Sequence, residues 1–291
     1  MMYKRRQGIH PAVIIILLAV LCVAAVICIL LLMGYRYVKN DDGYTFLGKV
    51  VNGQPVSGVI RYPDGKTATL DYYKNKLTFS NGDTYEGDIQ GLYEDGYGKI
   101  KYFATGDTYE GRLVRNKMMG KGKYVFKNGD TYEGEFVDGK MEGAGTYLWS
   151  DGSSYVGEFA SGLPNGQGIF TYAPVDGAPS SKYEGSFVNG MKHGVGTYYF
   201  DNGDVYTGEF VNDRQTGKGT YSWANGERYI GAFIDNQLDT RLKDESNEFI
   251  INDDGSYVHG EKAVYTWPNG RTYTGYFESS KIVAVNDSTG D

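Results

Sequence analysis

The sequence of 291 residues predicts an all-β fold, an elongated single antiparallel sheet of tandem β-hairpins preceded by one transmembrane α-helix. Three observations support this: an uncharged apolar run near the N-terminus, a Tyr-x-Gly motif that recurs mostly every 23 or 24 residues, and enrichment in glycine and tyrosine. There are 42 glycines and 27 tyrosines but only 7 prolines, which excludes collagen and the Pro/Gly-rich disordered class.

The chain is expected to divide into five segments. These are a short basic N-terminal segment (1–11), a transmembrane helix (12–33), a juxtamembrane linker (34–43), about nine hairpin repeats (44–283) and a C-terminal tail (284–291). The repeats are degenerate at 44–78 and at 236–262, where the motif is incomplete. Aromatic residues make up 15% of the chain and provide the apolar area that a folded array must bury.

The first element, Ala12–Met33, is 22 residues long and carries no charge, and 15 of its residues are Val, Ile or Leu. As a helix it would span roughly 33 Å, enough for a hydrocarbon core of ~30 Å. A cleaved signal peptide is the alternative, because Val23-Ala24-Ala25 supplies small residues. The apolar run continues well past them, however, and exceeds the ~7–15 residues of a signal peptide's apolar region. A retained single-span anchor is therefore predicted.

The basic residues around this segment predict its orientation. Lys4, Arg5 and Arg6 precede the span, whereas Arg36 and Lys39 follow it. Because basic residues accumulate on the cytoplasmic side, the N-terminus is expected to be cytoplasmic and the repeats extracytoplasmic.

The Tyr-x-Gly motif marks the repeat and decides the fold. Its tyrosines are Tyr85, Tyr109, Tyr132, Tyr155, Tyr183, Tyr206, Tyr229 and Tyr273. Around turn dipeptides such as Asn128-Gly129 and Asp151-Gly152, small and aromatic residues recur at every second position, which is the period of a β-strand. Asn-Gly and Asp-Gly accept the positive φ of tight turns, so each repeat is predicted to be a hairpin with strands of about five residues. A single hairpin is marginally stable, so the hairpins are expected to stack edge to edge.

The repeat motif is almost complete in one stretch, which runs from Gly122-Lys123-Tyr124 through Asn128-Gly129-Asp130-Thr131-Tyr132-Glu133-Gly134. This pattern resembles the MORN (membrane occupation and recognition nexus) repeat family, and the resemblance covers most of the chain. It implies a long curled ribbon of antiparallel hairpins with aromatic residues along its inner face. It also implies a scaffold, since members of the family commonly serve as scaffolds whose repeats are linked to membranes or partner proteins.

The alternation places glycine rows beside aromatic rows on one face. A ring can then lie across the bare backbone of a neighbouring strand, and Gly145 is expected beneath such a ring. The opposite face carries Thr131, Glu133 and Glu135 in one repeat, and it is expected to be acidic and solvated.

Net charge narrows the choice of partner. Residues 1–40 hold five basic and no acidic residues, so the rest of the chain carries −7 − 5 = −12. This field repels phosphates, and neither nucleic acid nor anionic lipid headgroups are expected to bind the repeats.

No residue pattern indicates catalysis, a cofactor or a metal site. The recurring glutamates follow the repeat period, which indicates a structural or solubility role. His10, His193 and His259 are the only histidines, and we expect them in solvated loops. The charged interruption Asp239–Asn247 is likewise expected to be a solvated loop rather than a site.

The aromatic face is the candidate site for a protein or peptide partner. Its residues are Tyr109, Tyr124, Tyr132, Tyr147, Trp149, Tyr155, Tyr206, Tyr221, Trp223 and Tyr229. Two interpretations stay open, since these rings either fill a packed core or line an open groove. The sequence favours a non-catalytic, membrane-tethered scaffold or interaction module, and the alternative is a cell-wall glycan-binding module that stacks sugars on Tyr and Trp.

Overall fold

The computed structural model describes residues 10–175 and 177–283 of the chain. The fold is mostly β, as predicted: one long helix precedes 22 described strands, and neighbouring strands pair antiparallel as hairpins. The strands belong to two compact units, unit 1 (1–117) and unit 2 (118–291). The predicted tail 284–291 and the basic segment up to residue 9 lie outside the described residues.

Helix α1 spans Pro11–Leu32 and agrees with the predicted span to within one residue at each end. Every described side chain from Ala12 to Met33 is exposed. The stretch Ala12–Leu32 is long and apolar enough to cross a membrane, although a signal sequence near an N-terminus has the same properties.

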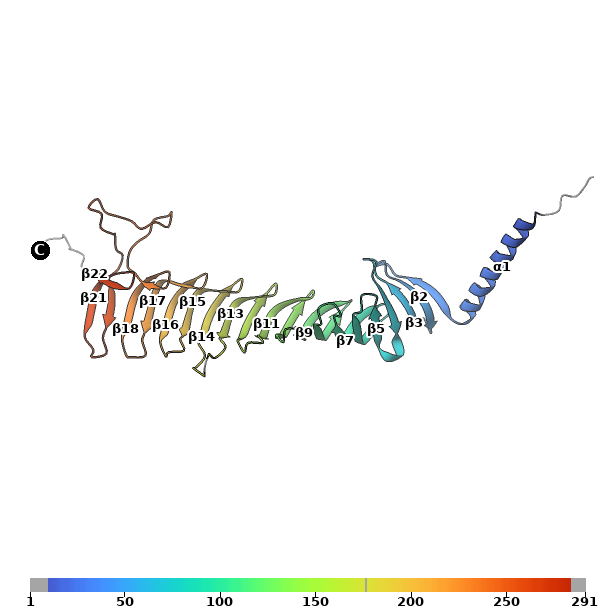
Figure 1. Cartoon of the computed structure of the whole chain (residues 1–291), viewed down its shortest axis with the longest axis horizontal. Helices are drawn as coiled ribbons and strands as arrows, with labels where there is room; N and C mark the ends of the chain where they lie inside the picture. The colour runs from blue at the N-terminus through green and yellow to red at the C-terminus, as the bar shows by residue number, and fades with distance from the viewer. Residues whose placement is uncertain (1–9, 176, 284–291) are drawn as a thin grey trace, which may run out of the picture. The chain divides into compact units, whose positions relative to one another are not determined.

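Unit 1 forms one antiparallel sheet (Figure 1). Its strands are β1 Tyr35–Lys39, β2 Thr45–Val51, β3 Gln54–Arg61, β4 Thr67–Asp71, β5 Lys76–Phe79, β6 Thr84–Gln90, β7 Tyr93–Lys101 and β8 Thr108–Val114, with a short 3-10 helix, η1, at Tyr72–Lys74. Strand β1 lies within residues 34–43, for which a linker is expected, and it pairs with β2. Its alternating Tyr35 and Tyr37 have the two-residue period of a strand.

Unit 2 continues the hairpin pattern and contains the most regular repeats (Figure 1). Its strands are β9 Lys117–Val125, β10 Thr131–Val137, β11 Lys140–Leu148, β12 Ser154–Ala160, β13 Leu163–Thr171, β14 Lys182–Val188, β15 Met191–Tyr199, β16 Val205–Val211, β17 Arg214–Ser222, β18 Arg228–Ile234, β19 Gln237–Leu238, β20 Ala263–Thr266, β21 Thr272–Glu278 and β22 Lys281–Val283. The regular strands are seven and nine residues long, longer than the predicted five.

Two kinds of turn alternate along unit 2. Asp138 and Gly139 both have positive φ (49° and 82°) and join β10 to β11 as a two-residue hairpin. Between β9 and β10, only Gly129 of the Asn-Gly pair has positive φ (95°). There Asn128 instead accepts a hydrogen bond on its side chain from the backbone N–H of Asp130 (3.0 Å). The Asn-Gly dipeptide therefore makes the wider turn.

The core of unit 2 is a ladder of buried rings, here called the core ladder. It consists of Tyr132, Phe136, Tyr155, Phe159, Tyr183, Phe187, Tyr206, Phe210, Tyr229, Phe233 and Phe277. Successive rings meet edge to face, with centroids 4.8–5.2 Å apart and interplanar angles of 78–88°. Each tyrosine hydroxyl donates to the backbone carbonyl three residues later, so no buried hydroxyl of this ladder lacks a partner.

Glycine rows make room for this ladder, as predicted. Gly145 pairs directly with Gly134, and the ring of Tyr132 lies over both. A Cβ atom at Gly145 would lie 2.5 Å from Cε2 and 2.6 Å from Oη of Tyr132. No real Cβ contact is that short, so a side chain at this position forces the ring to move.

Gly145→Val is therefore expected to destabilise the protein by about 1–3 kcal/mol through overpacking. Glu133→Ala is the control, because Glu133 is exposed on the opposite face and such changes usually stay within ~0.5 kcal/mol. Thermal unfolding of the full chain in detergent micelles measures the difference. Equal melting shifts for the two variants would show that the two faces are assigned incorrectly.

Candidate functional site

A row of half-buried rings runs beside the core ladder along unit 2, and we call it the aromatic row. Its members are Tyr124, Phe126, Tyr147, Trp149, Phe170, Tyr172, Tyr198, Phe200, Tyr221, Trp223, Tyr265 and Trp267. Neighbouring centroids lie 4.5–5.8 Å apart from the first ring to the last. Six repeats thus supply one continuous aromatic surface.

Local sequence explains the row. Each repeat ends its second strand with an aromatic-x-aromatic triplet such as Tyr147-Leu148-Trp149, and residues two apart in a strand share one face. Tyr147 pairs directly with Tyr132 of the core ladder, so the two sets of rings lie on the same side of the sheet. Leu148, between the two rings of the triplet, is 45% exposed on the other side.

The aspartate of the Asn-Gly-Asp turn fixes part of the row. Asp130 accepts a hydrogen bond from the Tyr147 hydroxyl (3.0 Å) and another from the backbone N–H of Ser150 (2.8 Å). The Ser150 N–H, together with donors at Asn128 and Tyr147, lowers the pKa of Asp130 despite its desolvation. Desolvation and this carboxylate raise the pKa of Tyr147 to about 12, so the hydroxyl keeps its proton and donates.

Asp204 repeats this arrangement three repeats later. It accepts from the Tyr221 hydroxyl (2.8 Å) and from the backbone N–H of Ala224 (2.9 Å). Each aspartate therefore joins its own turn to the next one and holds a tyrosine of the aromatic row. Side chains restrained in this way lose little rotamer entropy when a ligand binds.

The ten predicted site residues separate into two groups. Tyr124, Tyr147, Trp149, Tyr221 and Trp223 belong to the aromatic row and are half-buried. The other five, which are Tyr109, Tyr132, Tyr155, Tyr206 and Tyr229, have 0% exposure and present no surface to a partner. Tyr109 lies on β8 of unit 1, and the other four belong to the core ladder.

Seven members of the row are missing from the predicted set. Phe126, Phe170, Tyr172, Tyr198, Phe200, Tyr265 and Trp267 complete it. The signal that finds them is the aromatic-x-aromatic triplet before each wide turn, whereas the Tyr-x-Gly motif marks the core ladder.

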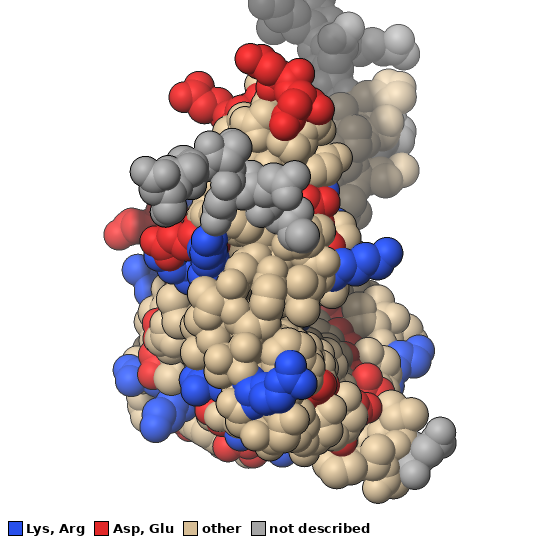
Figure 2. Space-filling view, turned by 90° about the vertical axis from the view of Figure 1, so that its left-hand side faces the viewer, with Lys and Arg blue, Asp and Glu red and all other residues tan. Residues whose placement is uncertain are grey.

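The aromatic row borders a groove at its C-terminal end. This groove has a volume of about 670 Å³ and is lined by four rings of the row and by the last strands. Its main lining residues are Tyr221, Trp223, Tyr265, Trp267, Leu238 and Phe277. Figure 2 looks onto this end of the molecule and shows mostly uncharged surface over its middle, with many of the Lys, Arg, Asp and Glu side chains toward its margins. This groove belongs to the last repeats of unit 2.

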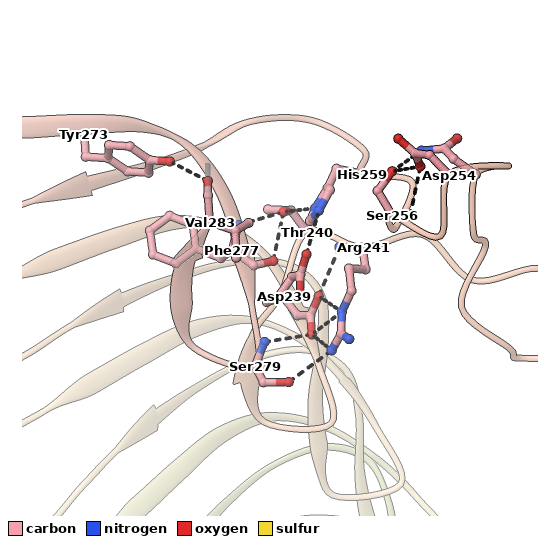
Figure 3. Close-up of polar contacts among 12 residues, drawn as sticks. Asp239, Thr240, Arg241, Asp254, Ser256, His259, Tyr273, Phe277, Ser279 and Val283 are labelled. Atoms are coloured by element: carbon pink, nitrogen blue, oxygen red, sulfur yellow. Dashed lines mark hydrogen bonds and ion pairs between the residues drawn. The ribbon is translucent and has the colours of Figure 1, made fainter. Parts of the chain in front are cut away.

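Residues 239–262 form an excursion between β19 and β20, and this segment differs from the prediction. β18 pairs directly with β20 across it, so the degenerate repeat adds no hairpin to the sheet. The expectation of a solvated loop at Asp239–Asn247 is wrong for its first residues, since Asp239 and Thr240 are each 1% exposed. Arg241 donates to both carboxylate oxygens of Asp239 and also to Ser279 (Figure 3).

His259 is also not a solvated loop residue, because its side chain is only 4% exposed. One ring nitrogen contacts Thr240 Oγ1 (2.8 Å), as Figure 3 shows. The other contacts Glu278 Oε1 (3.2 Å). Thr240 Oγ1 in turn accepts from the backbone N–H of Phe277 (2.9 Å). These contacts fasten the excursion to strand β21 and indicate a structural role.

Within residues 10–175 and 177–283, no three His, Cys, Asp or Glu side chains gather as a metal site would require.

Comparison with known proteins identifies the repeat. The model of the family described as MORN repeat matches residues 109–131, 132–154, 155–174, 183–205, 206–228 and 254–270. These matches contain all twelve rings of the aromatic row. A comparison with curated proteins gives no match.

Several solved structures are similar in part. The TCP10 domain of Danio rerio CPAP is 10% identical, with a TM-score of 0.32 over 82% of this chain and 98% of that one. The TCP domain of Drosophila melanogaster SAS-4, in complex with a proline-rich motif of Ana2, is 14% identical, with a TM-score of 0.18 over 84% and 90%. A streptogramin B lyase is 10% identical, with a TM-score of 0.16 over 84% of both chains. At such low TM-scores these likenesses support no conclusion about this chain.

Proposed function

Because residues 109–270 make this chain a member of the MORN-repeat family, we propose that it is a non-catalytic interaction module whose aromatic row binds a peptide segment of a partner protein. The observation that supports this most is the row itself, twelve half-buried rings in unbroken contact. Tyr and Trp dominate binding hot spots because they bury large areas and lose few rotamers. A sheet that needed the rings only as core would bury them, as the core ladder does.

We further propose that α1 tethers the module to a membrane as an uncleaved single span. The helix is apolar on all sides and its described side chains are exposed, which suits lipid. The basic residues before it favour a cytoplasmic N-terminus and extracytoplasmic repeats. The tether also makes lipid binding by the acidic repeats unnecessary.

The chain is expected to stay in the membrane pellet after alkaline carbonate extraction, because insertion of α1 gains on the order of 5–9 kcal/mol. Immunoblots of pellet and supernatant measure this, and mass spectrometry locates the mature N-terminus. A mature N-terminus near Val26 would identify the helix as a cleaved signal. Protease added to intact cells tests the orientation separately. If the repeats were protected from the protease, they would lie in the cytoplasm, and the proposed orientation would be reversed.

Trp149→Ala and Trp223→Ala are each expected to weaken peptide binding by about 2 kcal/mol or more, which is about 30-fold. Peptides selected from a random library on the full chain in detergent micelles provide the probe, and affinity is measured by fluorescence anisotropy. Thr146→Ala is the control, because Thr146 is exposed on the opposite face near Trp149.

Only variants whose circular dichroism confirms the native fold enter this comparison, since removal of a ring also costs packing. Folded tryptophan variants that bind as well as Thr146→Ala would overturn the proposal. A panel of cell-wall glycans is measured in parallel. Row-dependent binding of a glycan without any peptide binding would replace the peptide proposal with the glycan one.

A further inference from the structure

We infer that the segment bound by the aromatic row is proline-rich and basic, and that it lies along the row as a polyproline II helix, one turn per repeat. This inference rests on the proposed function and specifies its ligand. The spacing of the ring pairs, three free indole donors and the carboxylates beside the row support it.

The spacing of the ring pairs selects the conformation of the ligand. Each repeat contributes one pair, such as Tyr147 and Trp149 or Tyr221 and Trp223, and each repeat adds two strands to the sheet. Strands lie about 4.7–4.9 Å apart, so equivalent rings recur every ~9.4–9.8 Å. A polyproline II helix has three residues per turn at ~3.1 Å each, or ~9.3 Å per turn. Every third residue of such a segment therefore meets an equivalent ring pair.

Other backbone conformations fit this spacing less well. The same face of an α-helix recurs after seven residues, or ~10.5 Å, which exceeds the repeat by roughly 1 Å. Over four repeats the mismatch between the α-helix and the ring pairs grows to about 3–4 Å, more than half the width of a ring. For polyproline II the mismatch stays at or below ~2 Å. An extended strand repeats its face every ~6.7 Å and meets only some of the pairs.

The row also offers hydrogen-bond donors that such a ligand needs. A polyproline II segment has no internal hydrogen bonds, so its carbonyl groups face outward and accept. In the part of the chain that the structure describes, the indole N–H groups of Trp149, Trp223 and Trp267 make no hydrogen bond, and all three residues are half-buried rather than enclosed. Aromatic rings with a free N–H suit proline-rich segments, whose rings pack against them without loss of backbone entropy.

Charge adds the preference for basic residues. Asp130 and Asp204 accept hydrogen bonds from Tyr147 and Tyr221, and Glu227 lies close enough to Tyr265 to raise the pKa of that tyrosine, so three carboxylates lie beside the row. Residues 41–291 carry a net charge of −12, which attracts a cationic segment over longer distances. Lysine or arginine between the prolines therefore complements this surface.

The test uses the full chain in detergent micelles and fluorescent peptides built from Pro-Pro-Lys triplets. Three, four, five and six triplets are compared, and the affinity is expected to rise with each added triplet. Peptides of the same lengths built from Ala-Ala-Lys carry the same charge without polyproline II structure and are expected to bind at least about 10-fold more weakly. An amphipathic Leu/Lys heptad peptide represents the helical ligand.

Three variants connect the binding to the row. Trp149→Ala is expected to weaken the longest Pro-Pro-Lys peptide about 30-fold. Trp149→Phe keeps a ring but removes the donor, and is expected to cost about 3- to 10-fold. Thr146→Ala is expected to leave the affinity unchanged.

The outcomes separate the two proposals. Equal binding of the Pro-Pro-Lys and Ala-Ala-Lys peptides, or an affinity indifferent to Trp149→Ala, overturns the polyproline inference. If the heptad peptide or a selected peptide without prolines binds instead, and Trp149→Ala abolishes that binding, the interaction module stands and only the ligand class is wrong. If no peptide binds in a way that depends on the row, both proposals fail.

Discussion

Replacing Tyr155 with alanine is expected to destabilise unit 2 by about 3–5 kcal/mol, the usual cost of removing a large buried ring. Tyr155 has 0% exposure and meets Phe159 and Phe187 edge to face, with centroids 5.1 and 5.0 Å away. The glycines below it cannot fill the space, because they have no side chain. A cavity would therefore remain at the middle of the core ladder.

Tyr155→Phe separates the ring from the hydroxyl. The hydroxyl donates to the carbonyl oxygen of Glu158 (2.9 Å), and its loss is expected to cost about 1 kcal/mol. Val156→Ala is a second control, since Val156 is the adjacent residue and is 50% exposed on the other face. Thermal unfolding in micelles measures all three variants.

Hydrogen exchange locates the effect within the array. Each repeat contacts only its neighbours. In Tyr155→Ala, the protection of backbone N–H groups from exchange is therefore expected to decrease mainly in β12 and in the strands that pair with it. If Tyr155→Ala cost no more than Val156→Ala, the core ladder would not be the main source of stability in this unit.

Asp239→Asn is the second change with a large expected effect, a loss of about 3–5 kcal/mol, because it leaves a buried guanidinium without its charge partner. The Asp239 side chain is 1% exposed and that of Arg241 is 10% exposed. Arg241 also stacks on Phe249 and Tyr257, with its guanidinium carbon 3.8 and 4.7 Å from the ring centroids. This ion pair therefore attaches the excursion together with the contacts of Thr240 and His259.

The pH dependence has a definite sign. Burial alone would raise the pKa of Asp239, but the hydrogen bonds from Arg241 and Ser279 outweigh it and hold the pKa below its ordinary value of 3.8. The contribution of the pair is therefore present at neutral pH and is lost as the pH falls through that lowered pKa.

Glu245→Gln is the matched control for Asp239→Asn, because it also removes a carboxylate from the excursion and Glu245 is exposed. Thermal unfolding at neutral pH compares the two, and hydrogen exchange follows the backbone N–H groups of Phe277 and Ser279. Equal stability of both variants would mean that the ion pair contributes nothing to the attachment of the excursion.

The sequence alone determined the architecture of the repeats and the position of the helix. The Tyr-x-Gly motif recurs at a fixed period, and on both sides of each Gly-containing turn small and aromatic residues occupy every second position. Each strand then has one face of glycines and rings, which requires hairpins. Gly145 beneath the Tyr132 ring follows from this alternation without any coordinates. The apolar run likewise located α1, because 22 uncharged residues in a row are long enough for one continuous apolar helix.

Only the tertiary structure decided which rings are buried and which lie at the surface. Tyr132 and Tyr147 are opposite each other in adjacent strands and share one face, yet one has 0% exposure and the other is half-buried. The difference arises because Phe136 and Phe159, from two strands, both pack edge to face against Tyr132. The excursion shows the same limit, because Asp239 looks like a loop residue in the sequence and becomes buried only when Arg241 and Ser279 surround it. Burial depends on contacts between residues far apart in the chain, which a local pattern does not encode.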